Sequence, residues 1–148
     1  MPEEFIMRGQ TADSATEKLN FTGKTPGYGY RLIQFEIYPS TGIGATEIEA
    51  MATITAAKTA EDPQNPNFNN PGLIGTAVWN NYYTTGYIPG PGHVVINDLF
   101  VITQDLILKV RDATSAKPVN WQCKFKKVKL STSAEAVANF NQFTIYDD

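Results

Sequence analysis

The chain has 148 residues, a length that fits one domain with a single substantial core and leaves little room for two. Only 18% of the residues are charged, and 12 Lys and Arg stand against 15 Asp and Glu, giving a formal net charge of −3. This balance disfavours proteins that bind nucleic acid or anionic lipid. The sequence has no run of about 18 apolar residues and no basic, apolar N-terminal leader, so we expect neither a membrane span nor conventional secretion.

Short segments of alternating apolar and polar residues follow one another along the chain. YRLIQFEIYP places Ile33, Phe35 and Ile37 on one face and polar residues on the other, as in a half-buried strand. IEAMATITAAK alternates in the same way from Ile48 to Ala56, and its Thr-Ile-Thr run favours a strand over a helix. Further strands are predicted in FIMRGQ, TEKLNFTG, GLIGTAVW, two parts of VVINDLFVITQDLILKVRDA, VNWQCKFKKVKLS and FTIYDD.

Two local features refine this pattern. In VNWQCKFKKVKLS the apolar positions change parity after Phe125, and an extra residue near Lys126 and Lys127 would restore one apolar face, so we expect a β-bulge there. SAEAVANF, residues 133–140, has a capping serine and near-helical spacing, which predicts one short helix near the C-terminus. About eight or nine short strands without a βα repeat predict an all-β fold, a single antiparallel β-sandwich of jelly-roll-like type over residues 1–148.

The residues that usually carry catalysis are scarce. His93 is the only histidine and lies at a predicted strand entry, while Cys123 lies between Trp121 and Phe125 on a predicted core face, where a thiol behaves as a small apolar group. One cysteine cannot form an intramolecular disulfide or a thiolate metal site. The glycine-rich turns match no phosphate-binding motif, and the aspartates are too scattered to specify a metal cage. We therefore predict no enzyme, no cofactor and no metal site.

The segment WNNYYTTGYIPGPGH, residues 79–93, concentrates aromatic residues beside turn residues. Trp79, Tyr82, Tyr83 and Tyr87 can stack on sugar rings, can form a protein interface, or can fill the core of another strand. The sequence leaves these three interpretations open.

Two other segments are candidate contact regions. EDPQNPNFNNPG, residues 61–72, holds three prolines and four asparagines and is interpreted as a long excursion from the sandwich, with Phe68 as its candidate contact residue. Lys126 and Lys127 belong to a lysine cluster with Lys124 and Lys129. This cluster is either a solvated strand that discourages edge-to-edge aggregation or a site for an acidic patch on a neighbour.

The runs MRGQTADSATEKLNFTGKTPGYGYRLIQFEIYPSTGIG, VINDLFVITQDLILKVRD and PVNWQCKFKKVKL resemble small uncharacterised proteins of marine tailed bacteriophages over most of the chain. The resemblance implies a virion location and partners that are further copies of the chain, the major capsid protein or another virion protein, without nucleic acid or membrane. The resulting hypothesis is a capsid decoration (cement) or minor capsid subunit that bridges shell subunits. The alternative is a carbohydrate-binding or receptor-binding module whose partner is a glycan.

Overall fold

The computed structural model describes residues 3–21, 27–41, 47–81 and 90–130. All regular elements in these residues are strands: β1 (Glu4–Thr11), β2 (Thr16–Leu19), β3 (Tyr28–Pro39), β4 (Ile48–Thr55), β5 (Leu73–Asn81), β6 (Gly90–Ile96), β7 (Leu106–Asp112) and β8 (Val119–Lys129). The helix predicted at 133–140 and the strand predicted in FTIYDD lie outside the described residues.

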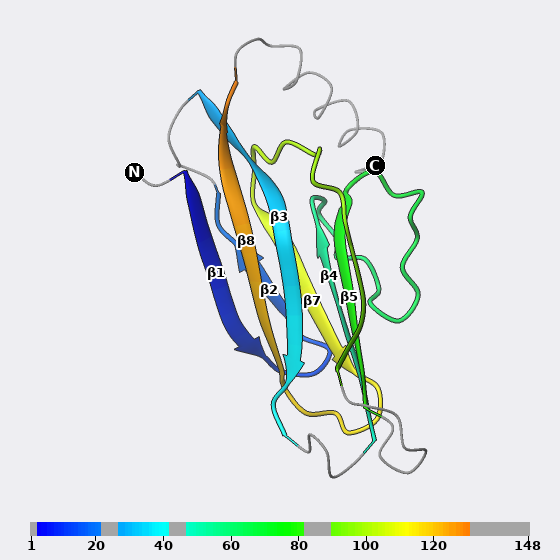
Figure 1. The fold of residues 1–148 in the computed structure, drawn as a ribbon. Coiled ribbons are helices and arrows are strands. Elements are labelled where there is room, and N and C mark those ends of the chain that lie inside the picture. Colours follow the sequence, from blue (N-terminus) through cyan, green and yellow to red (C-terminus); the bar gives the residue numbers. More distant parts are fainter. Residues whose placement is uncertain (1–2, 22–26, 42–46, 82–89, 131–148) are drawn as a thin grey trace.

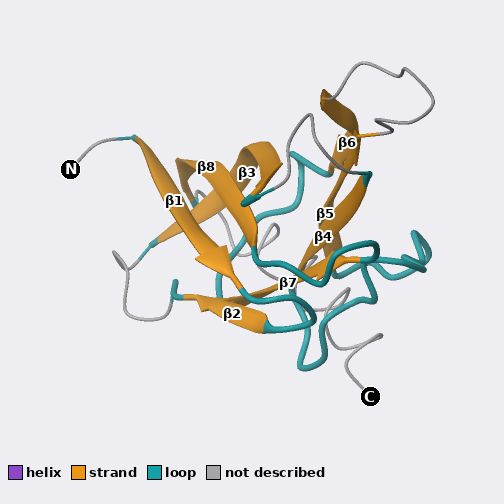
Figure 2. Ribbon diagram, turned by 90° about the horizontal axis from the view of Figure 1, so that it is seen from below, coloured by secondary structure: helices purple, strands orange, loops and turns teal. Residues whose placement is uncertain are grey.

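The strands form two antiparallel sheets that pack against each other (Figure 1). The three-stranded sheet has the order β1-β8-β3, and the five-stranded sheet has the order β2-β7-β4-β5-β6. In the view along the strands, β1 lies over β2, and β3 lies toward the β5 and β6 side (Figure 2). The predicted antiparallel β-sandwich is therefore confirmed.

The pairing of strands is nested along the chain. The first strand pairs with the last, β2 pairs with β7, and β4 pairs with β5, which is the order expected of a jelly roll. β6 departs from this order because its hydrogen-bonded partner is β5, although it also contacts β3. As a result, β6 forms one edge of the five-stranded sheet and β2 forms the other.

The core lies between the sheets and follows the alternation of the sequence. The side chains that face it from the central strands are buried: Ile48, Ala50, Ala52 and Ile54 from β4, Leu106, Leu108 and Val110 from β7, and Val119, Trp121, Cys123 and Phe125 from β8. The two sheets approach closely at Gly75, where a Cβ atom would come within 3.0 Å of Leu32 Cδ2. Four aromatic rings fill the end of the core beneath β1, with centroids 4.9 to 6.1 Å apart: Phe5, Phe21, Tyr30 and Phe125.

The β-bulge is in a different strand from the predicted one. The β1–β8 ladder runs without a shift as far as Lys126, whereas the β3–β8 ladder shifts between Leu32 and Gln34. The extra residue is therefore Ile33 of β3, and the bulge predicted near Lys126 and Lys127 was wrong. β8 keeps its alternation through Lys129, so Val128 lies on the face opposite to Phe125 and no extra residue is present there.

This bulge also corrects the predicted face of β3. Tyr30 and Leu32 face the core before it, Phe35 and Ile37 face the core after it, and Ile33 is only half-buried. Because the bulge reverses the alternation, both apolar pairs of β3 reach the same core.

Candidate interaction surface

The segment between β4 and β5 covers the outer face of the five-stranded sheet. Thr53 and Thr55 point to this outer face, yet both are buried beneath the segment. The Thr53 hydroxyl donates to the Glu61 carbonyl at 2.8 Å, and the Glu61 amide donates to the Thr55 hydroxyl at 3.1 Å. The predicted excursion at residues 61–72 is thus folded back onto the sheet.

Hydrogen bonds within this segment fix its shape. The Glu61 carboxylate accepts from the Asn67 amide and from the Asn70 side chain, each at 2.8 Å. The Asp62 carboxylate accepts from the Asn65 side chain at 3.1 Å and from the Gln64 amide at 2.9 Å, and these bonds lower the pKa of Asp62. Hydrogen bonds that involve asparagines therefore take the place of the strand ladder, which the prolines of this segment prevent.

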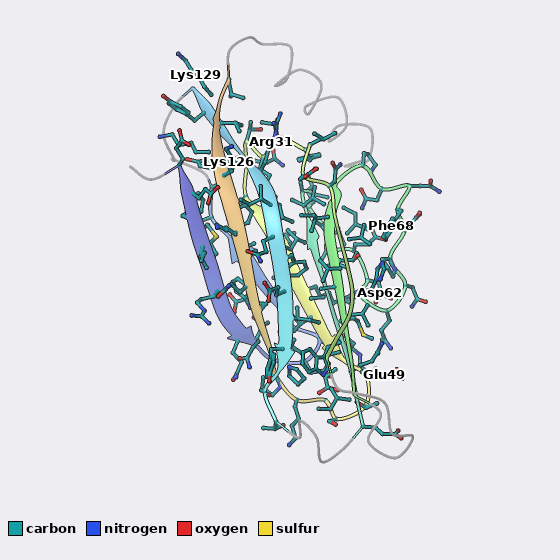
Figure 3. The ribbon with its side chains drawn as sticks, in the orientation of Figure 1. Arg31, Glu49, Asp62, Phe68, Lys126 and Lys129 are labelled. Carbon is teal, nitrogen blue, oxygen red and sulfur yellow. The ribbon has the colours of Figure 1, made fainter. Side chains whose placement is uncertain are left out.

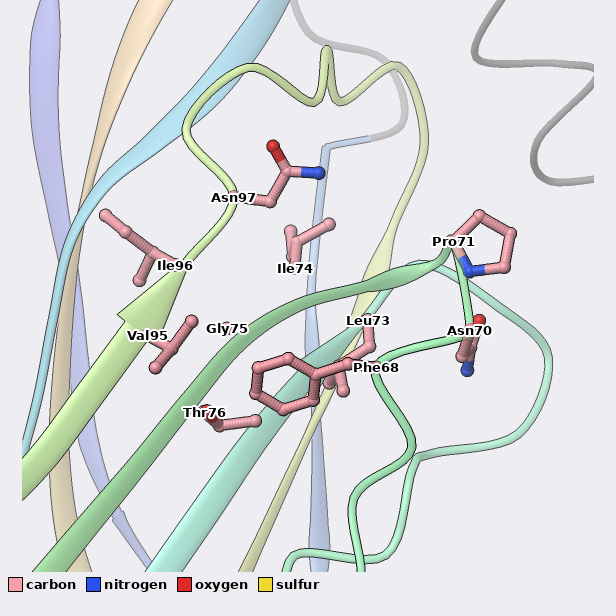
Figure 4. A pocket seen from close by; sticks show the side chains of 10 residues that line it. All are labelled: Phe68, Asn70, Pro71, Leu73, Ile74, Gly75, Thr76, Val95, Ile96 and Asn97. Carbon is pink, nitrogen blue, oxygen red and sulfur yellow. The ribbon is translucent and has the colours of Figure 1, made fainter.

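Phe68 is the large apolar side chain that this segment exposes, with 62% of its surface accessible. It borders a shallow groove of about 240 Å³, lined on one side by β6 and on the other by the segment (Figure 4). The lining residues are Phe68, Asn70, Pro71, Leu73, Ile74, Gly75, Thr76, Val95, Ile96 and Asn97.

Strand β6 extends this apolar region to the edge of the sheet. Val94 and Val95 are 39% and 38% exposed, on opposite faces of the strand, and Leu99 in the following turn is 76% exposed. The strand sequence GPGHVVI contains no Asp, Glu, Lys or Arg. We call Phe68, Val94, Val95, Leu99 and the groove together the β6 surface.

The opposite edge of the same sheet has a different character. β2 is only four residues long and exposes Glu17 and Lys18. The Lys18 ammonium lies 3.3 Å from the Asp105 carboxylate, which also accepts from the Phe21 amide at 2.6 Å. Phe21 itself is buried in the aromatic cluster.

The turn before β2 is also held by an ion pair and by hydrogen bonds. The Asp13 carboxylate accepts from the Arg111 guanidinium at 2.8 and 3.0 Å and from the Asp112 amide at 2.8 Å. Burial of Asp13 opposes its ionisation, but these hydrogen bonds and the arginine charge outweigh burial and lower the pKa of Asp13.

The predicted lysine cluster is divided between the two faces of β8. Lys126 is exposed on the outer face of the three-stranded sheet, in register with Glu4 on one side and Arg31 on the other (Figure 3). Lys127 points to the other face, where its ammonium lies 4.2 Å from the centroid of the Tyr28 ring. The two lysines therefore do not act on one neighbour as a single patch.

The aromatic segment is described only at its ends. Trp79 is 5% exposed, and its ring packs against Tyr38 with centroids 4.7 Å apart. It therefore offers no open face for a sugar, in agreement with the core-filling interpretation of this residue. Tyr82, Tyr83 and Tyr87 lie outside the described residues.

The two candidate reactive residues lie in different sheets, His93 on β6 and Cys123 on β8. His93 is exposed on β6 opposite Val78, and Cys123 is fully buried, with its thiol pKa raised to about 12 by burial. In the described ranges no group of three His, Cys, Asp or Glu residues could hold a metal ion. In the same ranges no helix is long and apolar enough to cross a membrane.

The exposure of Val94, Val95 and Leu99 was not predicted from the sequence, because the exposure of a strand depends on which strand pairs beside it. The absence of charge in GPGHVVI was the available signal. Comparison of the chain with protein-family models, curated proteins and solved structures finds no match.

Proposed function

We propose that the chain is a structural protein of a bacteriophage virion, a capsid decoration or minor capsid subunit that binds shell subunits through the β6 surface. The resemblance of its sequence to phage proteins supports the virion part of the proposal. The observation that carries the binding part is Phe68, a large ring that a hydrogen-bonded segment holds 62% exposed beside a groove.

The way Phe68 is held favours binding. Exposure of a phenyl ring to water is unfavourable, and its complete burial by a partner contributes about 1.5–3 kcal/mol. The hydrogen bonds that Glu61 accepts from the Asn67 amide and the Asn70 side chain hold the segment on both sides of the ring before any partner arrives. A partner therefore gains the burial without the entropic cost of ordering the segment.

The groove suits an apolar side chain of the partner. Pro71, Leu73 and Val95 provide apolar contact, while the exposed Asn97 provides a polar group at its rim. This arrangement, an apolar centre with a polar rim, is the one found in protein interfaces. The carbohydrate-binding alternative depended on Trp79, Tyr82, Tyr83 and Tyr87; Trp79 is buried, and the three tyrosines lie outside the described residues.

The test uses particles of a phage that encodes this chain, assembled without it. Purified protein is added, and the bound fraction is measured by co-sedimentation. Phe68→Ser is expected to weaken binding by about tenfold or more, equivalent to about 1.4 kcal/mol. The matched control is Ile6→Ser, which removes a 52% exposed apolar side chain from the outer face of the other sheet and should bind as the wild type does.

Two outcomes would contradict the proposal. One is wild-type protein that does not bind the particles at any concentration. The other is equal binding by the Phe68→Ser and Ile6→Ser variants, which would show that the β6 surface is not the contact.

A further inference from the structure

The backbone of β6 has hydrogen-bonding groups on its outward side. The Asn97 amide donates to the Ile74 carbonyl of the adjoining strand at 2.9 Å. Because the direction of these groups alternates along a strand, the amide and carbonyl of Val95 also point to β5. Those of Val94 and Ile96 therefore point outward, and in the described residues no strand pairs with that side of β6.

The charges on the edge strands distinguish β6 from the others. In the described part of the chain, β1 carries Glu4 and Arg8, β2 carries Glu17 and Lys18, and β3 carries Arg31 and Glu36. β6 carries none of these residue types. Two copies of β6 can therefore approach each other without like charges meeting, whereas a charged peptide would find no complementary charge on this strand.

We propose that β6 pairs antiparallel with β6 of a second copy, about a two-fold axis at Val95. Val94 then lies opposite Ile96 of the second copy, and Ile96 lies opposite Val94 of the second copy. Each of these two pairs exchanges both backbone hydrogen bonds, which uses all of the outward groups of Val94 and Ile96. The pairing joins the two five-stranded sheets into one continuous sheet.

Side chains match across this axis on both faces. On the outer face Val95 meets Val95 of the second copy, and polar His93 meets Asn97 of the second copy. On the inner face Val94, which is 39% exposed in a single copy, meets Ile96 of the second copy and extends the core. Apolar and β-branched pairs of this kind stabilise paired strands.

The axis also brings together the two binding grooves. Val95 lines the groove next to Phe68, so pairing at Val95 places the grooves of the two copies on the same face, on either side of the axis. A dimer therefore presents two Phe68 rings to the shell, and two-point binding is tighter than either contact alone. This inference deepens the proposed function, on which it rests, by naming a second copy as one partner.

Disulfide formation tests the axis directly. Residues at a position like Val95, a directly opposed pair without mutual hydrogen bonds, have Cα atoms about 4.5 Å apart, within the range of a disulfide. Val95→Cys is therefore expected to form a disulfide-linked dimer under mild oxidation. The matched control is Thr16→Cys, an exposed position on the β2 edge, which should form no disulfide-linked dimer. The native thiol does not interfere because Cys123 is buried and its pKa is raised to about 12.

A charge substitution tests the same axis without a covalent link, through the dissociation constant of the dimer. Val95→Lys places two ammonium groups opposite each other at the axis, and directly opposed like charges destabilise paired strands. Sedimentation velocity should give a dimer dissociation constant at least about tenfold higher than that of the wild type, a loss of about 1.4 kcal/mol. Thr16→Lys should leave this constant unchanged.

The inference is overturned if wild-type protein stays monomeric at all concentrations, or if Val95→Cys and Thr16→Cys cross-link equally. Its failure is distinguishable from failure of the proposed function. A monomer that still binds particles through Phe68 overturns only the dimer, whereas a wild-type dimer that does not bind particles overturns the proposed function.

Discussion

The two edges of the five-stranded sheet, β2 and β6, both have backbone groups without a ladder partner in the described part of the chain, but they differ in length and charge. An edge strand has backbone groups without a ladder partner, and it can pair with another chain unless it is short, charged or covered. β2 is short, exposes Glu17 and Lys18, and is fastened through Asp105 and Phe21. β6 is longer, uncharged and exposes apolar side chains on both faces. The β2 edge is therefore protected by contacts within the chain, whereas the β6 edge is the one that we propose a second copy covers.

The largest expected effect is on the free energy of unfolding, and it distinguishes Phe21, beside β2, from Phe68, beside β6. Phe21→Ala removes a ring from the cluster with Phe5, Tyr30 and Phe125, so it should lower the free energy of unfolding by about 3–5 kcal/mol. Phe68→Ala removes a mostly exposed ring and should change it by no more than about 0.5 kcal/mol. Urea denaturation of both variants measures the contrast, and a large loss from Phe68→Ala would mean that this ring supports the fold rather than binding.

A smaller loss of unfolding free energy is expected when the carboxylate that holds the turn before β2 is removed. Asp13→Asn replaces a carboxylate that accepts from Arg111 and Asp112, and it should cost about 1.5–3 kcal/mol at neutral pH. The pKa of Asp13 is lowered in the folded state, so its stabilisation is complete above the unfolded value of about 4 and is lost as pH falls through the folded value. Denaturation between neutral and acidic pH measures this loss. The difference between wild type and Asp13→Asn should shrink in that window, and a constant difference would contradict the assignment.

The smallest effect on stability comes from making β2 resemble β6. Lys18→Val removes an ion pair whose ammonium side is mostly exposed, so the free energy of unfolding should fall by at most about 1 kcal/mol. The same change removes a charge that opposes edge pairing, so light scattering should show new self-association that Val95→Lys does not reverse. If Lys18→Val leaves association unchanged, charge is not what keeps the β2 edge closed.

Much of the sandwich was predictable, because alternation alone identified the strands around Phe35, Ile54, Leu108 and Phe125. The bulge was assigned to the wrong strand because the apolar residues after Phe125 change parity in β8. The ladder shows that Val128 lies on the face opposite to Phe125, whereas the extra residue is Ile33 of β3. Alternation is a local property, and the choice of which strand absorbs an extra residue is settled by pairing between distant segments.

The candidate site was predictable only in part. Phe68 was found because prolines and asparagines around it exclude a core strand, and an apolar residue in such a segment is conspicuous. That the segment packs on the buried Thr53 and Thr55 was not predictable, since threonine is equally common on an open face. The exposure of Val94 and Val95 follows from the pairing of β6 with β5 at the edge of the sheet, which is a long-range property.

Amide hydrogen exchange along β6 shows whether a second copy pairs with this edge. The Val95 amide, which points to β5, should be protected at every protein concentration. The Val94 and Ile96 amides should exchange rapidly in dilute protein and become protected as concentration rises. Exchange at Val94 and Ile96 that does not depend on concentration would mean that no second copy pairs with β6.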